Sequence, residues 1–262
     1  MSDQLSELDR LQLQSLVWEP AGRRLLDELG EGVGLRTLDI GCGCLGWLRL
    51  LSNWVGPTGQ CTGTEIADSM VEAAREFCLS ENLTNVRIVI DDLFNSRLPE
   101  ASFDLVHARF QLAPIGKFED QINCYLKLVA PGGYLVLEDP DTASWHFVPD
   151  APQTNRLIEL ILQAFTAHGG DFNAGRYEFD LLTNAGFEPQ IRAEITALTP
   201  THPYLHLPIQ FATSLRPRLL EIYDHDALDE LVASAAREIA TPGRRGLSFT
   251  LVQTWVKKPA IS

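Results

Sequence analysis

Three glycines follow a short, mostly apolar run that contains an aspartate, in the sequence TLDIGCGCLGWLRLL at residues 37–51. Asp39 ends the run, and Gly41 and Gly43 form a turn. Gly46 falls inside the helix expected after the turn. Glycine suits such a turn because a bound ligand must touch the backbone, and a Cβ atom would hold the ligand away. The pattern predicts a ligand-binding turn, although a tight strand–helix turn without a ligand uses the same residues.

An acidic residue, Glu65, ends the next apolar run about 20 residues beyond the glycines, where a carboxylate accepts hydrogen bonds from the two hydroxyls of a ribose. The third run ends in IDDLF, so that Asp91 or Asp92 is placed to reach an adenine amino group. A fourth run, FDLVHARF, borders the same site. The glycine turn and Glu65 predict an adenosine-type ligand and do not by themselves distinguish NAD from S-adenosylmethionine. The runs IDDLF and FDLVHARF, with the pair of strands that closes the chain, favour S-adenosylmethionine.

Apolar runs alternate with helical patterns through this part of the chain. Such alternation is typical of a parallel α/β sheet, which brings the carboxyl ends of its strands to one edge. The expected strands are 37–40, 61–65, 86–90, 103–108 and 133–139, and the expected helices are 47–55, 67–82 and about 117–129.

Helical patterns also flank this region. Roughly the first thirty residues predict two helices, the second opened by Pro20 and stopped by Gly30. Another helix is expected over 153–167, and a further one stops at Gly186 before a sixth strand. The segment 247–258 is apolar on both faces and predicts a last strand inside the sheet. The expected units are a helical cap over 1–34, a core over 35–195 and 246–262, and an insertion over 196–245 that covers the sheet edge.

The composition excludes several classes of partner. The chain has 21 Lys and Arg against 35 Asp and Glu, which gives a net charge of −14. Such a surface repels a phosphate backbone, so no nucleic-acid partner is expected. The first residues are acidic where a signal peptide is basic, and no apolar run approaches the roughly 20 residues that span a bilayer. We therefore expect a cytoplasmic protein without membrane insertion.

Five cysteines are an odd number and are scattered, which argues against a disulfide framework. Cys42 and Cys44 form a CxC pair far in sequence from any histidine. We expect both to be small apolar residues of the core, and no metal site is expected.

The motifs LDIGCG, Glu65, IDDLF and LVAPGGYLVLED together resemble the class I S-adenosylmethionine-dependent methyltransferases. The chain is similar to the small-molecule branch, which includes ubiquinone-, sterol- and natural-product-type enzymes. The resemblance spans roughly residues 15–190 and the last strand. It implies a Rossmann-like seven-stranded sheet of order 3-2-1-4-5-7-6, flanked by helices, with the last strand antiparallel. It also implies S-adenosylmethionine as the cofactor, and no second mononucleotide half follows, as an NAD enzyme would require.

The resemblance assigns the cofactor-binding residues by position. Around the methionyl part it implies Asp39, Gly41, Cys42 and Gly43. For the ribose and adenine it implies Glu65, Ile66, Met70, Asp92 and Leu93, with Asp91 as the second choice of acid. Beside the amino-acid end it implies Ala108 and Arg109, although Arg109 also fits a surface salt bridge. Trp18 either caps the cofactor or anchors a helix on the sheet.

One position departs from the family. The glycine that usually stands two residues past Gly43 is Leu45 here. If the turn needs a positive φ at this position, leucine costs on the order of 1 kcal/mol or more. A shift of the turn onto Gly46 would remove that cost.

Methyl transfer from a sulfonium is an in-line displacement with an activated leaving group, so no catalytic residue is obligatory. Where an acceptor needs a general base, histidine is the first candidate. His107 at the end of the fourth strand and His146 beyond the fifth are the two candidates, and each also fits a structural role. If the run from His202 to His206 were extended, His202, Tyr204 and His206 would share one face, either as a solvated edge or as a polar lip over the pocket.

The leading hypothesis is methyl transfer to an oxygen, nitrogen or carbon of a small, largely apolar acceptor, since apolar residues dominate the expected cover. A second hypothesis is cyclisation or rearrangement that uses the cofactor without methyl transfer. A third is a binding protein that lacks catalysis. The sequence does not decide whether the chain forms a homodimer.

Overall fold

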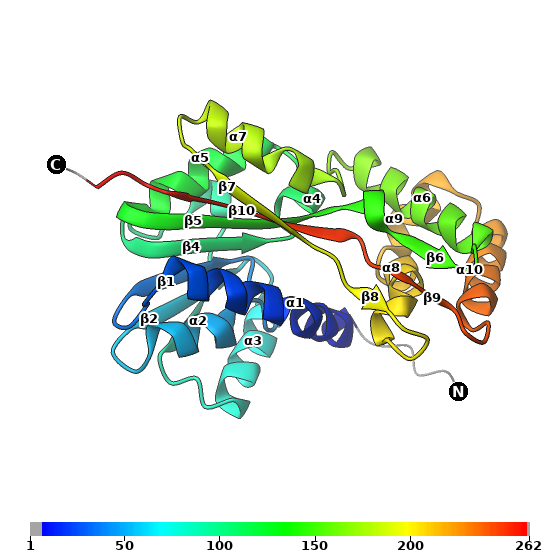
Figure 1. Cartoon of the computed structure of the whole chain (residues 1–262), viewed down its shortest axis with the longest axis horizontal. Helices are drawn as coiled ribbons and strands as arrows, with labels where there is room; N and C mark the ends of the chain where they lie inside the picture. The colour runs from blue at the N-terminus through cyan, green and yellow to red at the C-terminus, as the bar shows by residue number, and fades with distance from the viewer. Residues whose placement is uncertain (1–6, 261–262) are drawn as a thin grey trace.

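The computed structural model describes residues 7–260. Its centre is a seven-stranded sheet of order β3-β2-β1-β4-β5-β10-β7 (Figure 1). The strands are β1 (Arg36–Ile40), β2 (Gln60–Glu65), β3 (Val86–Ile90), β4 (Phe103–Arg109), β5 (Val129–Asp141), β7 (Gln190–Glu194) and β10 (Thr250–Lys257). Strands β1 to β5 are parallel, and β10 is antiparallel to both β5 and β7. This confirms the Rossmann-like sheet and the strand order that the resemblance implied.

The register of the parallel strands brings the predicted binding residues to one edge. Ile40 of β1 pairs with Thr64 of β2 and with Ala108 of β4. The residues that end or follow these strands, Gly41 and Glu65 among them, therefore lie at the same level of the sheet.

Helices cover both faces of the sheet (Figure 1). On one face lie α1 (Glu7–Leu29), α2 (Leu48–Val55) and α3 (Asp68–Ser80), and on the other lie α4 (Leu112–Ile115), α5 (Phe118–Leu128) and α7 (Glu178–Asn184). Leu25, Leu51 and Val71 pack into the core of the first face. Tyr125 and Leu182 pack into the core of the second. Full burial of each such apolar side chain stabilises the fold by roughly 1.5–3 kcal/mol.

The N-terminal segment forms one helix, α1, so the prediction of two helices split at Pro20 is wrong. Proline lacks the N–H that would bond to the carbonyl of Leu16, which removes one bond of the helix. The spacing of Trp18, Ala21 and Leu25 nevertheless places all three on a buried face, so packing favours a continuous helix. The helix ends before Gly30, at φ +97°, as predicted.

A helical cover adjoins the carboxyl ends of the strands, at the right of Figure 1. It comprises α6 (Pro152–Ala167), α8 (Leu207–Ser214), α9 (Arg216–Ile222), α10 (His225–Ile239) and a small sheet of β6 (His146–Val148), β9 (Arg245–Leu247) and β8 (Ala197–Leu198). Short 3₁₀ helices complete the described chain: η1 (Leu93–Asn95), η2 (Thr142–Ser144), η3 (Ala174–Arg176) and η4 (Pro203–His206). The run from His202 to His206 is not extended, because η4 turns Tyr204 into the core, where its side chain is 1% exposed.

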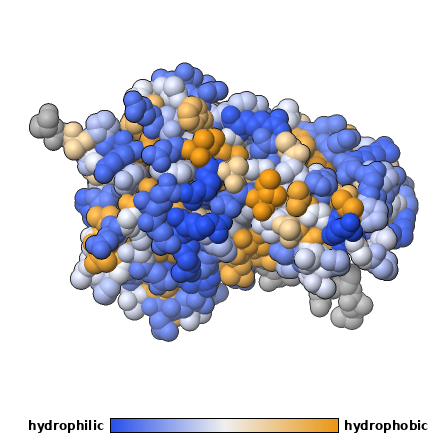
Figure 2. All heavy atoms as spheres, in the orientation of Figure 1, coloured by the Kyte–Doolittle hydropathy of each residue, from blue (hydrophilic) through white to orange (hydrophobic). Residues whose placement is uncertain are grey.

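The surface seen in Figure 2 is mixed, with hydrophobic residues in small groups among hydrophilic ones. The largest hydrophobic group in this view lies near the middle, between the large sheet and the helical cover. Within residues 7–260, no helix combines the length and the apolarity needed to cross a membrane.

Candidate functional site

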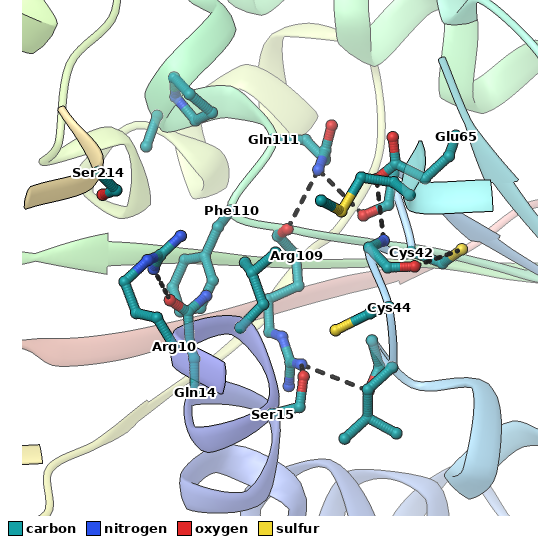
Figure 3. A pocket seen from close by; sticks show the side chains of 18 of the residues that line it. Arg10, Gln14, Ser15, Cys42, Cys44, Glu65, Arg109, Phe110, Gln111 and Ser214 are labelled. Atoms are coloured by element: carbon teal, nitrogen blue, oxygen red, sulfur yellow. Dashed lines mark hydrogen bonds between the residues drawn. The ribbon is translucent and has the colours of Figure 1, made fainter. Parts of the chain in front are cut away.

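A cavity of about 440 Å³ opens at the carboxyl edge of β1, β2 and β4 (Figure 3). One end, here called the turn end, is lined by Gly41, Cys42, Gly43, Glu65 and Met70. The other, here called the cover end, is lined by Arg10, Phe165, Phe172, Phe211, Ser214, Arg218 and Phe249. In Figure 3, Glu65 and Ser214 lie on opposite sides of the cavity. The cavity therefore joins the predicted nucleoside site to the helical cover.

The turn end is built on three glycines in the left-handed region, with φ +60° at Gly41, +57° at Gly43 and +43° at Gly46. A Cβ on Gly46 would lie 2.3 Å from Oδ2 of Asp39 and 2.5 Å from the carbonyl oxygen of Cys42. Gly46 precedes α2, so its predicted place inside that helix is wrong. Because Gly46 takes the left-handed conformation and Leu45 does not, leucine carries no backbone strain there.

Hydrogen bonds of the Asp39 carboxylate hold the glycine turn in place. Its Oδ2 accepts a 2.7 Å hydrogen bond from the backbone N–H of Trp47, and its Oδ1 lies 2.7 Å from Nδ1 of His107. Asp39 is 1% exposed, and it also lines the cavity. It thus ties the glycine turn to the start of α2 and to β4.

Glu65 reaches across to the same turn. Its Oε1 accepts a 2.9 Å hydrogen bond from the N–H of Gly43, and its Oε2 accepts a 3.1 Å bond from the N–H of Ile66. Partial burial raises the pKa of Glu65, and these two N–H groups oppose the rise. A carboxylate has about four acceptor sites, so both oxygens keep lone pairs for the hydroxyls of a ribose.

The space above Gly43 is open, since the nearest atom to a Cβ built there is 4.0 Å away, on Leu11. Gly41 differs, because Nε2 of Gln111 lies over it and donates to its carbonyl oxygen at 3.3 Å. The open backbone at Gly43 beside the Glu65 carboxylate fits a nucleoside with a polar tail. The residues present therefore fit S-adenosylmethionine.

Cys42 and Cys44 are both buried and free, as expected for small core residues. Burial, then the nearby charges of Asp39 and Glu65, raise the pKa of the Cys42 thiol well above its usual value. Among the described residues, no group of three or more His, Cys, Asp or Glu side chains is placed to hold a metal ion.

His107 lies behind the turn and does not line the cavity, which contradicts its predicted role as a base toward the acceptor. Its ring is fully buried and stacks on Trp47, with centroids 3.8 Å apart. Nδ1 faces Asp39 at 2.7 Å and Nε2 faces Oε2 of Glu138 at 3.2 Å. Burial lowers the pKa of His107, but the hydrogen bonds and charges of Asp39 and Glu138 outweigh it and raise the pKa above 6.5.

The second candidate base, His146, is also outside the cavity. It is exposed on β6, and its Nδ1 lies 2.8 Å from the carbonyl oxygen of Ser144. His146 is therefore not placed at the cavity, and its role at the reacting atom stays a prediction. Successive side chains of a strand point to opposite faces, so β6 buries Phe147 and leaves His146 exposed.

Trp18 anchors α1 and does not line the cavity. Its side chain is 1% exposed, and its ring lies 5.5 Å from that of Phe249 between centroids. Its Nε1–H donates a 3.2 Å hydrogen bond to the hydroxyl of Tyr204. Of the two roles expected for Trp18, this geometry favours the anchor and contradicts the cofactor cap.

The predicted adenine-binding residues lie next to Glu65 but outside the lining of the cavity: Ile66, Asp91, Asp92 and Leu93. The N–H of Asp91 donates to the carbonyl of Glu65 at 3.0 Å, so the β3 end adjoins the β2 end. Asp92 caps η1 by accepting from the N–H of Phe94 at 3.0 Å. Their contact with adenine stays a prediction.

Of the two residues predicted beside the amino-acid end of the cofactor, Arg109 lines the cavity and Ala108 does not. Ala108 is 1% exposed in β4 and packs in the core, so it does not line the cavity. Arg109 lines the cavity and is 7% exposed, which contradicts the alternative of a surface salt bridge. Its Nη2 donates to Oγ of Ser15 at 2.9 Å and to the carbonyl of Gly46 at 3.4 Å, and its Nη1 lies 3.8 Å from Glu138.

Several lining residues were missed from the sequence, among them Arg10, Gln14 and Ser15 of α1. Their spacing of four and five residues puts polar side chains beside the apolar face of one helix, and this was the available signal. Phe110, at φ +55°, and Gln111 follow β4, where the sequence shows no turn residue. A bulky residue in the left-handed region is strained, and such strain concentrates at ligand sites.

Comparison with known proteins agrees with this geometry. A family model described as a methyltransferase domain matches residues 37–133. Demethylmenaquinone methyltransferase of Staphylococcus aureus is 31% identical over 123 residues, which cover 47% of this chain and 49% of that protein. The chain thus spans about half the length of the curated relatives it matches.

Solved structures share the fold. Phosphoethanolamine N-methyltransferase 2 of Haemonchus contortus, solved with S-adenosylhomocysteine, has a TM-score of 0.57 at 16% identity and covers 98% of this chain and 59% of that one. The cyclase SpnF has a TM-score of 0.55 at 20% identity, with 93% of this chain and 84% of that one covered. The match to a methyltransferase domain covers the glycine turn and strands β1 to β4, and the solved structures show that the chain shares their fold.

Proposed function

We propose that this protein transfers the methyl group of S-adenosylmethionine to a small, largely apolar acceptor. The observation that carries the proposal is one cavity with two unlike ends. At the turn end, Glu65 and the open backbone of Gly43 fit a nucleoside, and at the cover end four phenylalanines supply an apolar wall. An apolar pocket with few polar groups is typical of small-molecule sites.

The residues of the turn end have separable roles in this proposal. Glu65 accepts hydrogen bonds from the ribose, and Asp39 holds the turn in the shape that the nucleoside needs. Arg109 lines the cavity while its Nη1 lies 3.8 Å from Glu138, and we propose that its guanidinium faces the carboxylate of the cofactor. When bound, S-adenosylmethionine supplies a methyl group on a positively charged sulfur.

The cover end contributes alignment and exclusion of water. Phe165 and Phe172 lie 5.0 Å apart between ring centroids, and Phe211 lies 5.4 Å from Phe172. We propose that residues 196–245, together with α6, cover the acceptor. An aligned nucleophile in a dry site lowers the barrier to displacement without a dedicated base.

Isothermal titration with S-adenosylmethionine and S-adenosylhomocysteine tests the proposal. We expect saturable binding of both, and Glu65→Ala should weaken it roughly tenfold or more, because hydrogen bonds to a charged group contribute about 1.5–3 kcal/mol. Glu72→Ala, at an exposed acid on α3, is the matched control and should leave the affinity unchanged. Absence of binding by the wild-type protein at millimolar cofactor would refute the proposal.

A second candidate is cyclisation or rearrangement without methyl transfer. It is favoured by one observation: no histidine, lysine or tyrosine is found among the described residues that line the cavity. The fold is compatible with such chemistry, as the cyclase SpnF shares it. Product mass separates the two candidates, since transfer adds a methyl group and rearrangement adds nothing. A binding protein without catalysis would give neither product.

A further inference from the structure

The two ends of the cavity differ in charge. The carboxylates among the described lining residues, Asp39 and Glu65, both lie beside the glycine turn. Arg10 and Arg218 stand at the cover end, where the same part of the chain contributes no carboxylate to the lining. Among the described residues, the lining of this end thus carries two arginines and no carboxylate.

Arg10 is held in place by neighbours from two elements. Its Nη1 donates a 2.9 Å hydrogen bond to Oε1 of Gln14, one turn further along α1 (Figure 3). Its Cζ lies 5.0 Å from the ring centroid of Phe211 on α8. The side chain is 8% exposed, so its charge is largely desolvated and interacts strongly with any charge placed beside it. Arg10 therefore presents an oriented guanidinium at the boundary of α1 and the cover.

Arg218 approaches the cavity from α9 and is half-buried. The residues that the structure describes give it no hydrogen bond and no ion pair. Its neighbour Arg216 differs, because that side chain forms a 2.7 Å ion pair with Asp229. Of these two arginines of α9, the one at the cavity is thus left available to a ligand.

We propose that the cover end binds an acceptor with an apolar, aromatic-sized body and one anionic group, a carboxylate or an ionised enol or phenol, held by Arg10 and Arg218. The proposal rests on the proposed function, because it takes the turn end to be filled by the cofactor. Guanidinium groups lower the pKa of an acidic group beside them. An acceptor held in its ionised form needs no proton removed, which agrees with a cavity whose described lining offers no histidine, lysine or tyrosine.

The phenylalanines explain why the anion must have an apolar body. The ring of Phe249 lies 5.6 Å from that of Phe172 and at 89° to it, so the two present an edge-to-face wall. Such a wall excludes water and favours a flat, apolar partner. A small hydrated anion such as free phosphate would leave this wall uncovered.

The test uses two probes of the same shape, 2-naphthoate and its neutral counterpart 2-naphthamide. Binding of each to the full chain is measured by isothermal titration, with and without saturating S-adenosylhomocysteine. We expect the naphthoate to bind roughly tenfold more tightly than the amide, since charge-assisted hydrogen bonds are about twice as strong as neutral ones. Arg218→Gln and Arg10→Gln should each reduce that preference severalfold and leave the affinity for the amide unchanged.

Arg237→Gln is the matched control, because Arg237 is exposed on α10 and pairs with Glu230 at 2.9 Å, away from the cavity. It should keep the full preference for the anion. Equal affinities of the wild-type protein for the two probes would overturn the proposal, as would a preference that survives both arginine substitutions. Should Arg10→Gln fail to fold by circular dichroism, Arg218→Gln decides, since its side chain is half-exposed and forms no described contact that folding needs.

The design separates this proposal from the function on which it rests. If S-adenosylhomocysteine binds and the naphthoate shows no preference, the methyltransferase proposal stands and the anionic acceptor is refuted. If the cofactor does not bind while the preference persists without it, the methyltransferase proposal is refuted, and the cover end binds an anion that is not a methyl acceptor.

Discussion

Nδ1 of His107 lies 2.7 Å from Oδ1 of Asp39, and this contact ties the interior of β4 to the acid that holds the glycine turn. The other oxygen of Asp39 accepts the N–H of Trp47, whose indole N–H donates to Glu138 at 3.0 Å. His107 also faces Glu138, so its ring lies between two buried carboxylates. The shape of the glycine turn therefore depends on a network of which Asp39 lines the cavity, while His107, Trp47 and Glu138 lie behind it.

This network predicts a pH dependence. The folded-state pKa of His107 is raised above 6.5, so the stability it contributes is complete below pH 6.5 and is lost as pH rises through the folded pKa. We expect His107→Asn to remove that decline and to lower the free energy of unfolding by roughly 3 kcal/mol, because it leaves buried carboxylates unpaired. Urea unfolding between pH 6 and 9 measures both effects. His146→Asn, at an exposed histidine, should shift stability by less than about 0.5 kcal/mol.

Gly46→Ala should disrupt the turn. The substitution places a Cβ against Asp39 and Cys42 and also forces alanine to φ +43°, which costs about 1–2 kcal/mol by itself. Gly243→Ala is the matched control, since Gly243 has φ +77° and no atom within 4 Å of the added Cβ. Both variants should lose stability, but titration calorimetry should show weakened cofactor binding in Gly46→Ala alone. Equal cofactor affinities would show that contact at Gly46 does not shape the site.

Asp139 predicts a second pH effect in a lower range. Burial raises its pKa from 3.8 to about 7, although the N–H groups of Leu112 and Ala113 oppose the rise. The folded protein then binds more protons than the unfolded chain between about pH 4 and pH 7. Stability therefore falls as pH rises through that window, by up to about 1.4 kcal/mol per pH unit for this one carboxyl group. Asp139→Asn should flatten the decline in a series of urea titrations.

Asp141 is the control for Asp139, because its pKa is shifted in the opposite direction. Its hydrogen bond to Arg176 lowers its pKa, so its contribution is present above pH 3.8 and is lost as pH falls through the folded pKa. Asp141→Asn should change the acid limb and leave the range from pH 4 to 7 as in wild type. A decline in Asp139→Asn as steep as in the wild-type protein would contradict the assignment to Asp139.

Trp18→Phe and Tyr204→Phe remove the same hydrogen bond, between Nε1 of Trp18 and the hydroxyl of Tyr204. Each should lower the free energy of unfolding by about 1 kcal/mol, and the double variant should lose less than the sum because the two residues share one interaction. Thermal unfolding measures these losses. Affinity for S-adenosylmethionine should be unchanged in all three, and a tenfold loss confined to Trp18→Phe would restore the role of cofactor cap.

Local patterns predicted the elements that depend on near neighbours. The five parallel strands and the helices between them follow the alternation of apolar runs, and the glycine turn with Glu65 predicted the turn end of the cavity. Those predictions succeeded because strand burial and helix periodicity are properties of short segments. Pro20 shows the limit, since a proline signals a helix boundary locally but packing of the surrounding face overrides it.

The sequence by itself determined the sheet, the glycine turn and Glu65, which faces the turn. Each depends on residues that are adjacent in the sequence or that lie in consecutive strands. Only the tertiary structure decided the rest of the site. Arg109 meets Ser15 across 94 residues and Trp18 meets Tyr204 across 186, and no local pattern encodes such contacts. The same holds for His107, which the strand pattern left free to face either way, and for the arginines of the cover end. Their positions depend on how α1 and the cover pack over the sheet, which is set by burial of apolar surface throughout the chain.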